Sequence, residues 1–122
     1  MSEKKSILII DDEADIAEIL ATLLEDDFNC ECVTSGDDGL AKAQNGSFDG
    51  IITDLEMPDI SGIKIIQSIR ESGSKIPIFI STGHDMGHPK VQTALGIGAQ
   101  GALLKPFLDP DELIAKIKPF LG

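Results

Sequence analysis

Short apolar runs alternate with longer segments of helical periodicity from one end of the chain to the other. The apolar runs predict strands near residues 6–11, 29–34, 48–54, 76–81 and 100–105. The segments that follow them predict helices near residues 14–26, 37–45, 62–72, 89–95 and 110–120. The strand segments are apolar almost throughout, which is typical of parallel strands that helices cover on both faces. The pattern therefore indicates an α/β fold built from five βα units.

The first and last helices show which of their sides should be buried. The first has an apolar stripe with the spacing i, i+3, i+4, i+7, i+8, made of Ile16, Ile19, Leu20, Leu23 and Leu24. In the last helix, Asp109, Pro110 and Glu112 occupy the positions of an N-cap, a first helical residue and a capping-box partner. Its apolar face consists of Leu113, Ile114, Ile117, Phe120 and Leu121. We expect both faces to pack on the sheet.

Residues 1–122 are expected to form one domain. No Pro/Gly/Ser-rich or low-complexity segment divides the array, and the length suits a single domain. Five βα units then form a three-layer sandwich, for which the predicted topology is a flavodoxin-like parallel five-stranded sheet in the order 2-1-3-4-5. Periodicity alone does not fix that order.

The chain carries a large excess of negative charge. Ten Lys and Arg residues against 21 Asp and Glu residues give a formal net charge of −11. This charge repels nucleic acids and anionic membrane surfaces, so we expect direct binding to neither. Because no apolar run has the length of a signal-peptide core or a membrane span, the protein is expected to be cytoplasmic.

The two cysteines, Cys30 and Cys32, lie two positions apart on the second predicted strand. Their side chains should therefore point to the same face, where we expect them to be small core residues. A structural disulfide between them is not expected, and two cysteines alone make a poor zinc site.

Three of the apolar runs end abruptly at charged residues. Asp11 and Asp12 follow the first run, Asp54 ends the third, and Lys105 follows the fifth. In an open parallel sheet, ligand sites lie just outside the carboxyl ends of the strands, so these residues should meet in one crevice. Three aspartates and a lysine in one place suggest a hard cation together with an anionic, phosphate-like group.

Each of these charged residues also has an ordinary interpretation. Asp11 and Asp12 could be the acids that commonly precede a helix, and Lys105 could be a surface lysine. Asp54 is harder to explain in this way because the next predicted helix begins only near Gly62, so Asp54 cannot cap it. A lone carboxylate at the end of a buried strand is costly unless it is paired or bound to a metal, which favours a functional role.

The fourth apolar run ends in Thr82-Gly83. A hydroxyl group followed by an unhindered backbone N–H can bind an anion. Alone, this feature is weak because such pairs are also common in turns.

In combination, these motifs resemble the CheY-like receiver domain of two-component response regulators. The matching residues are Asp11-Asp12, Asp54 with Met57-Pro58-Asp59-Ile60-Ser61-Gly62, Thr82-Gly83, Gly98-Ala99 and Lys105-Pro106-Phe107. The resemblance covers essentially the whole chain. It implies a phosphorylation-controlled signalling module that catalyses only its own phosphorylation and dephosphorylation, and is not an enzyme for an outside substrate.

The resemblance also implies specific roles at the site. Asp54 would accept a phosphoryl group from a sensor histidine kinase or a histidine phosphotransfer protein. Asp12, Asp54 and the backbone carbonyl of Glu56 would ligate Mg²⁺, or Mn²⁺ as an alternative, with Asp11 assisting through water. The physics agrees, because Mg²⁺ prefers oxygen ligands, keeps several waters and shares its site with phosphate.

The remaining implied roles concern the phosphoryl oxygens. The side chains of Thr82 and Lys105 and the backbone of Gly83 would bind them. Lys105 would precede Pro106 through a cis peptide bond. Glu56 and His84, two positions after Asp54 and Thr82, would flank the path of the water that removes the phosphoryl group.

The chain departs from the receiver pattern at two places. Three residues before Lys105, where receivers commonly carry Tyr or Phe as a switch residue, the chain has Ala102. Gly87-His88-Pro89 interrupts the start of the fourth helix, which should therefore be short or mobile. We expect His84 and His88 to be solvated loop residues and neither metal ligands nor phosphodonors.

Two other functions remain open from the residues alone. A haloacid-dehalogenase-like Mg²⁺-dependent phosphatase also places a nucleophilic Asp after an apolar strand, but Asp54-Leu55-Glu56 departs from its Asp-x-Asp motif. A receiver-like domain that is never phosphorylated is disfavoured because every acceptor-site residue is present. The sequence names neither the cognate kinase nor the output protein or downstream domain.

Overall fold

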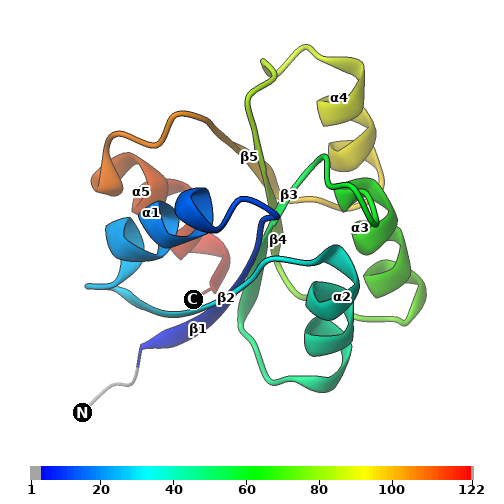
Figure 1. The fold of residues 1–122 in the computed structure, drawn as a ribbon, viewed down its shortest axis with the longest axis horizontal. Coiled ribbons are helices and arrows are strands. Elements are labelled where there is room, and N and C mark those ends of the chain that lie inside the picture. The colour runs from blue at the N-terminus through cyan, green and yellow to red at the C-terminus, as the bar shows by residue number, and fades with distance from the viewer. Residues whose placement is uncertain (1–3, 122) are drawn as a thin grey trace.

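The computed structural model describes residues 4–121 as alternating strands and helices (Figure 1). The strands are β1 (Lys5–Ile10), β2 (Phe28–Val33), β3 (Gly50–Asp54), β4 (Ile78–Thr82) and β5 (Gly101–Leu104). The helices are α1 (Ala14–Leu24), α2 (Gly36–Asn45), α3 (Gly62–Glu71), α4 (Pro89–Gly96) and α5 (Pro110–Leu121). All ten elements were predicted. Across the described residues, no helix combines the length and apolar character needed to cross a membrane.

All strand pairs in the sheet are parallel, and the sheet has the order β2-β1-β3-β4-β5. The predicted order is therefore confirmed. β1 and β3 pair at the centre, with Ile10 opposite Thr53. β3 and β4 pair so that Asp54 lies opposite Ser81. The carboxyl ends of the central strands consequently lie beside one another.

Helices cover both faces of the sheet, which gives the predicted three-layer sandwich. α1 and α5 lie on one face, and α2, α3 and α4 lie on the other (Figure 1). Each face has its own aliphatic core. On the α1/α5 side the core includes Ile9, Leu20 and Ile117, and on the opposite side it includes Ile10, Ile65 and Val91. Consecutive residues of β1 thus serve opposite cores, as the alternation of side chains along a strand requires.

The apolar stripes of the outer helices are only partly buried, which corrects the expectation for two of their residues. In α1 the fully buried line is Ala17, Leu20 and Leu24, whereas Ile19 is 48% exposed. In α5, Phe120 is 51% exposed, although its ring meets Phe79 edge-on at a centroid distance of 5.5 Å. The apolar face that the sequence predicts for each helix is thus wider than the part of the helix surface that packs against the sheet.

The expectation of two core cysteines is wrong for Cys32, whereas Cys30 packs against the core on the α1/α5 side. Cys30 is half-buried and Cys32 is exposed, and both are free thiols. The reason is that β2 is an edge strand, so α1 alone covers this face and leaves its rim open. Burial, with a smaller contribution from Cys32, raises the pKa of the Cys30 thiol to about 11. Cys30 is therefore protonated near neutral pH and is a poor nucleophile.

Candidate functional site

The predicted site residues meet at the carboxyl edge of the sheet. Asp11 and Asp12 follow β1 directly, and Asp54 is the last residue of β3. Thr82 ends β4, and Lys105 follows β5. Four strands that are adjacent in the sheet but distant in sequence thus supply all five residues.

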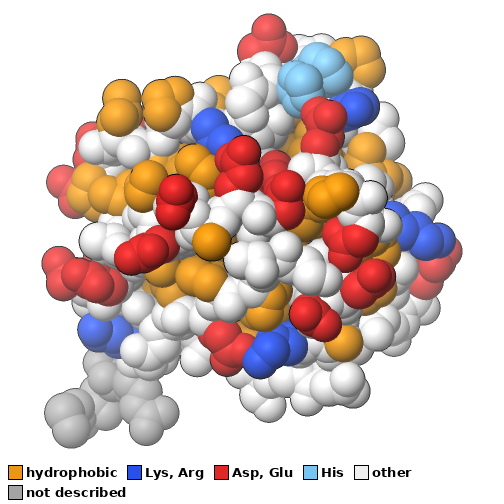
Figure 2. All heavy atoms as spheres, in the orientation of Figure 1, with side chains coloured by type: hydrophobic (Ala, Val, Ile, Leu, Met, Phe, Trp, Pro, Cys, Tyr) orange, Lys and Arg blue, Asp and Glu red, His pale blue; other side chains and the backbone are white. Residues whose placement is uncertain are grey.

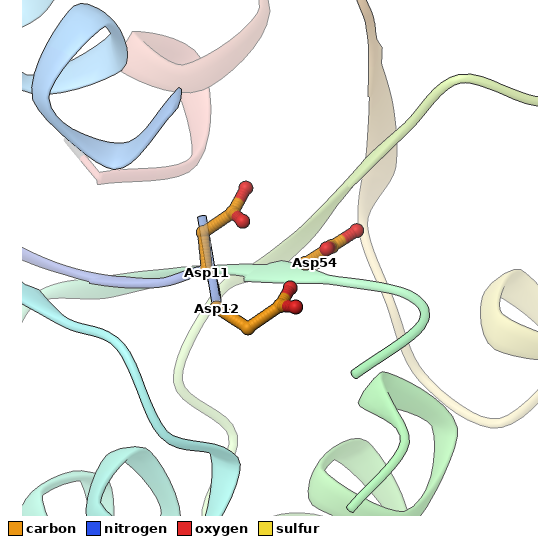
Figure 3. A group of neighbouring side chains, drawn as sticks. All are labelled: Asp11, Asp12 and Asp54. Atoms are coloured by element: carbon orange, nitrogen blue, oxygen red, sulfur yellow. The ribbon is translucent and has the colours of Figure 1, made fainter. Parts of the chain in front are cut away.

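The three aspartates form an acidic cluster in which one carboxylate oxygen of each lies within 4.8 Å of the others. Asp11 and Asp12 extend from the end of β1, and Asp54 extends from the neighbouring end of β3 (Figure 3). Asp11 is 2% exposed and Asp54 9% exposed, whereas Asp12 faces solvent. A cation from solvent could therefore approach the cluster from the side of Asp12.

Lys105 supplies the positive charge that this cluster needs. Its Nζ atom lies 3.3 Å from Oδ2 of Asp11 and 3.5 Å from Oδ1 of Asp54. The Lys105 backbone N–H donates to the Thr82 carbonyl at 2.8 Å, which continues the β4–β5 pairing beyond the end of β5. The peptide bond between Lys105 and Pro106 is cis, as the resemblance implied. Because the Lys105 side chain is 21% exposed and contacts both carboxylates, the ammonium group lies in the crevice and does not act as an ordinary surface charge.

Burial perturbs the protonation of Asp54. Burial raises the pKa of its carboxyl group to about 6, although the Lys105 ammonium and the backbone N–H groups of Glu56 and Leu55 lower it, while the Asp11 carboxylate raises it further. The carboxylate form is thus disfavoured by its surroundings unless a further cation is present. A perturbed carboxyl group in a crevice marks Asp54 as a functional candidate.

Thr82 and Gly83 lie beside the acidic cluster with different accessibility. The Thr82 side chain is almost fully buried, and its Oγ1 accepts a hydrogen bond of 3.0 Å from the His84 backbone N–H. Gly83 is exposed, and a Cβ atom at this position would meet no atom within 4 Å. The Thr82 hydroxyl is therefore held in place, while the Gly83 backbone remains open to a ligand.

The loop after Asp54 is anchored by tight contacts on both sides. A Cβ atom on Gly62 would lie 2.3 Å from the Asp54 carbonyl oxygen, so only glycine allows α3 to start this close to β3. Further along the loop, Asp59 accepts hydrogen bonds from the backbone N–H groups of Gly36 and Asp37 at the start of α2. These bonds, with that from Asp37 the strongest, lower the pKa of Asp59 to about 2. The segment that presents Asp54 is therefore fixed to both α2 and α3.

His84 and His88 contact each other, and His84 also contacts the loop after Asp54. A ring nitrogen of His84, Nε2, contacts the Glu56 carboxylate, and the His84 ring stacks on His88 with a centroid distance of 3.8 Å. Lys90 Nζ lies 3.2 Å from Oε2 of Glu56. Hydrogen bonds from His84 and Lys90 lower the pKa of Glu56. Both rings are thus only partly solvated, contrary to expectation. In Figure 2 they form the pale blue surface at the upper edge.

The start of α4 is better defined than Gly87-His88-Pro89 suggested. His88 is the N-cap, and its Nδ1 atom accepts a hydrogen bond of 3.1 Å from the Lys90 backbone N–H. The helix is short, with eight residues, as predicted. The capping role of His88 was missed because histidine is not among the usual N-cap residues.

Ala102 packs with Val91 and Ala94 in the core on the α4 side of the sheet, and an open apolar pocket of about 420 Å³ lies between β5 and α5. Its lining includes Phe79, Met86, Leu104 and Phe120. An aromatic side chain at this position would project from β5, which lies between α4 and α5 in the layers of the fold (Figure 1). The chain therefore lacks the ring through which receivers commonly transmit a signal.

The donor set of the acidic cluster fits a hard divalent cation. All of its groups are oxygen donors, and Asp12 leaves one side open to water, which suits an ion that retains part of its hydration shell. Cysteine and histidine ligands, which would favour a softer metal, do not take part in the cluster among the described residues. Mg²⁺ is therefore a chemically consistent occupant.

Comparisons with known proteins agree with this geometry. The family model of the response regulator receiver domain matches residues 7–118. Response regulator ArlR of Staphylococcus aureus is 39% identical over 94% of this chain, and transcriptional regulatory protein PcoR of Escherichia coli is 37% identical over 94%. The matches cover 52% and 50% of these relatives, so the chain spans about half their length.

A solved structure leads to the same family. The chemotaxis response regulator CheY4 of Vibrio cholerae is 30% identical and superimposes with a TM-score of 0.85, covering 97% of this chain and 99% of its own. A sheet of the order β2-β1-β3-β4-β5, an acidic crevice at its carboxyl edge and a family match over nearly the whole chain lead to one conclusion. The chain belongs to the response regulator receiver domains, which are phosphorylation-controlled signalling modules of two-component systems.

Proposed function

We propose that this chain acts as one receiver domain that accepts a phosphoryl group on Asp54 in a Mg²⁺-dependent reaction. The observation that carries the proposal is the position of Lys105 Nζ, 3.3 Å from Asp11 and 3.5 Å from Asp54 at a largely buried strand end. A carboxylate nucleophile, an ammonium group for phosphoryl oxygens and two further carboxylates for a cation together form a phosphoryl-transfer site.

The reaction begins with attack of an Asp54 carboxylate oxygen on the phosphorus of the donor. With a phosphohistidine donor, the new O–P bond forms as the P–N bond breaks, and the imidazole leaves with the electron pair of that bond and takes up a proton. The product is an acyl phosphate on Asp54. Water later attacks the same phosphorus, which releases inorganic phosphate and restores the carboxylate.

The neighbouring residues stabilise the charge that moves during the transfer. The Lys105 ammonium neutralises phosphoryl oxygens, and the Thr82 hydroxyl and the Gly83 backbone N–H donate hydrogen bonds to them. Lys105 is only 21% exposed at its side chain, so its charge is less screened than that of a surface lysine. The Lys105 ammonium already lies 3.5 Å from Asp54 before a donor arrives, which reduces the reorganisation needed for transfer.

Asp12, Asp54 and the Glu56 backbone carbonyl are the proposed ligands of Mg²⁺, with Asp11 assisting through a water molecule. When bound, the ion would neutralise negative charge on the phosphoryl group and on the aspartates. Mn²⁺ is an alternative because it also takes oxygen ligands. The close approach of the three carboxylates supports this ligand set.

The proposed donor is a sensor histidine kinase or a histidine phosphotransfer protein. The chain spans about half the length of its relatives. We therefore also propose that it acts on a downstream domain or on a separate partner protein. We infer that the signal is read on the surface of α4, β5 and α5. Met86, Leu104 and Phe120 support this choice because they are large apolar residues exposed on or beside these elements.

Mass spectrometry after treatment with acetyl phosphate or phosphoramidate and Mg²⁺ tests the acceptor. We expect one added phosphoryl group that is located on Asp54 and is lost in base. It should be absent from Asp54→Ala and present in Asp26→Ala, a control at an exposed residue after α1. Unchanged modification of Asp54→Ala would contradict the proposal, and steady Asp54-dependent turnover of phosphomonoesters would favour the phosphatase alternative instead.

A further inference from the structure

We infer that Glu56, His84, His88 and Lys90 form a connection, here called the clasp, that transmits the state of the acceptor site to the start of α4. The inference rests on the proposed function, because the event transmitted is phosphorylation of Asp54. The clasp joins three segments: the loop after β3, the loop after β4, and the first turn of α4.

Glu56 provides the first link. It lies two residues after Asp54, and its two carboxylate oxygens have different partners. One contacts Nε2 of His84, and the other lies 3.2 Å from Nζ of Lys90. A single side chain in the loop after β3 thus contacts both the loop after β4 and the first turn of α4. Displacement of the Glu56 backbone would pull on both partners at once.

Thr82 provides a second link from the site. Its Oγ1 accepts the hydrogen bond from the His84 backbone N–H at 3.0 Å, so the proposed phosphoryl ligand and the clasp share one hydroxyl group. If that hydroxyl turns toward a phosphoryl group on Asp54, the His84 amide must follow it or lose its acceptor. The Thr82 side chain is almost fully buried and the bond from the His84 amide to it is part-buried, so a turn of this hydroxyl group is expected to affect the loop after β4.

His88 carries the connection into α4. Its ring stacks on that of His84, with 3.8 Å between centroids and 17° between planes. The same ring caps α4 through Nδ1, which accepts the Lys90 backbone N–H, while the His88 backbone N–H donates to the Asp85 carbonyl at 3.1 Å. The cap of α4 therefore moves with His84, which in turn is tied to Thr82 and Glu56.

The helix at the end of this connection is lightly held. α4 has eight residues and only two fully buried side chains, Val91 and Ala94. An element with so few buried contacts shifts at low cost. Ala102 on β5 has no ring that could carry a movement toward α4, whereas the clasp is a set of side-chain contacts that runs from the loop after Asp54 to this helix.

The test compares wild type with His88→Asn/Lys90→Gln, with and without Mg²⁺ and beryllofluoride, a phosphoryl mimic. Asn retains an N-cap acceptor but removes the stacked ring, and Gln removes the charge pair with Glu56. The ¹⁹F signal of bound beryllofluoride reports occupancy, and amide exchange of residues 90–94 reports the response of α4. We expect at least a three-fold change in exchange in wild type and less than half of that change in the variant at equal occupancy.

A matched control is Lys42→Gln, which breaks the pair of Lys42 with Glu31. That pair is as exposed as the pair of Lys90 with Glu56, but it joins α2 to β2. An equal α4 response in wild type and clasp variant, or an equal loss in Lys42→Gln, would overturn the inference. If the double variant does not fold, His88→Asn and Lys90→Gln are tested singly against the same thresholds. Absence of bound beryllofluoride in wild type would instead overturn the proposed function, and the inference with it.

Discussion

Lys105 lies closer to Asp11 than to the proposed acceptor Asp54, with separations of 3.3 and 3.5 Å from its ammonium nitrogen to the two carboxylates. In this state a single positive charge serves two largely buried carboxylates, and the third aspartate of the cluster, Asp12, has no ion pair among the described residues. A metal ion that engaged Asp11 and Asp12 would release Lys105 to face a phosphoryl group on Asp54. Metal binding and readiness for phosphorylation are thus expected to be coupled.

The acidic cluster should make the metal-free protein less stable than it would be with one charge fewer. Like charges a few ångströms apart in a partly desolvated crevice cost on the order of 1 kcal/mol. Asp12→Asn is therefore expected to raise the melting temperature of the metal-free protein by about 3–5 °C and to abolish stabilisation by Mg²⁺. Thermal unfolding with EDTA and with Mg²⁺ measures both effects.

Asp26→Asn is the control for the Asp12 variant because it makes the same change in net charge outside the cluster. It should leave the Mg²⁺ effect intact. Equal stabilisation of wild type and Asp12→Asn by Mg²⁺ would place the metal elsewhere.

Gly62 should tolerate no side chain. In Gly62→Ala the new methyl group would lie 2.3 Å from the Asp54 carbonyl oxygen and 2.9 Å from the Leu55 Cα atom, both of them backbone. Relief requires a shift of the acceptor loop, so we expect a loss of roughly 1–3 kcal/mol in unfolding free energy and slower phosphorylation of Asp54. Urea denaturation and phosphoramidate kinetics give the two values.

Gly96→Ala is the matched substitution for Gly62→Ala. Gly96 is the last residue of α4, and a Cβ atom there would meet nothing within 4 Å. It should be neutral or should stabilise the protein by up to about 1 kcal/mol, because alanine favours helix. If both variants lost stability equally, the close approach at Gly62 would not be the cause.

Asp59 should make stability depend on pH in acid. Its pKa of about 2 lies below the ordinary value of 3.8, so the folded protein binds fewer protons than the unfolded chain between these values. Its contribution is therefore complete above about pH 4 and is lost as the pH falls toward 2. Asp59→Asn should be less stable than wild type at pH 7, with a difference that shrinks in urea denaturation at pH 2.5. A difference independent of pH would show that the charge of Asp59 is not what stabilises its hydrogen bonds to the start of α2.

Glu56 and His84 should control the lifetime of the phosphoryl group. The two side chains contact each other, and the resemblance implies that they flank the path of the attacking water. We expect the variant with both replaced by Ala to dephosphorylate at a rate altered at least several-fold, equivalent to roughly 1 kcal/mol in the barrier. Loss of radiolabelled phosphate from isolated phosphoprotein measures the rate, and a parallel Mg²⁺ titration identifies any change due to metal loss. An unchanged lifetime would mean that the two side chains do not reach the water.

Most of the fold could be predicted from the sequence because its signals are strong and mutually consistent. No predicted element differs from the structure by more than two residues at either end. Asp109 caps α5 as predicted, with Oδ1 accepting the Asp111 backbone N–H at 3.0 Å. The expected capping-box partner, Glu112, does not bond back to Asp109 among the described residues. Its Oε1 atom instead lies 3.9 Å from Nζ of Lys116. The charged strand ends also met as predicted, since parallel strands place their carboxyl ends at one edge.

The sequence did not predict how exposed particular side chains are, because exposure depends on how far neighbouring elements cover each helix or strand. Helical periodicity identified the side of α1 that faces the sheet but not the exposure of Ile19 at its margin. Cys32 could have been placed correctly, because the predicted strand order already put β2 at the edge of the sheet. The stacking of His84 on His88 had no signal in the sequence, since it depends on the path of a loop between Thr82 and α4.

The position of Lys105 has a consequence for how the site is assembled during synthesis. The three aspartates belong to β1 and β3 at the centre of the sheet, whereas Lys105 follows β5, an edge strand in the last part of the chain. A chain emerging from the ribosome therefore exposes its acidic residues well before their counter-ion. Only when β5 pairs with β4 does the lysine reach the aspartates, so β5, which emerges after the other four strands of the sheet, is also the strand that completes the proposed site.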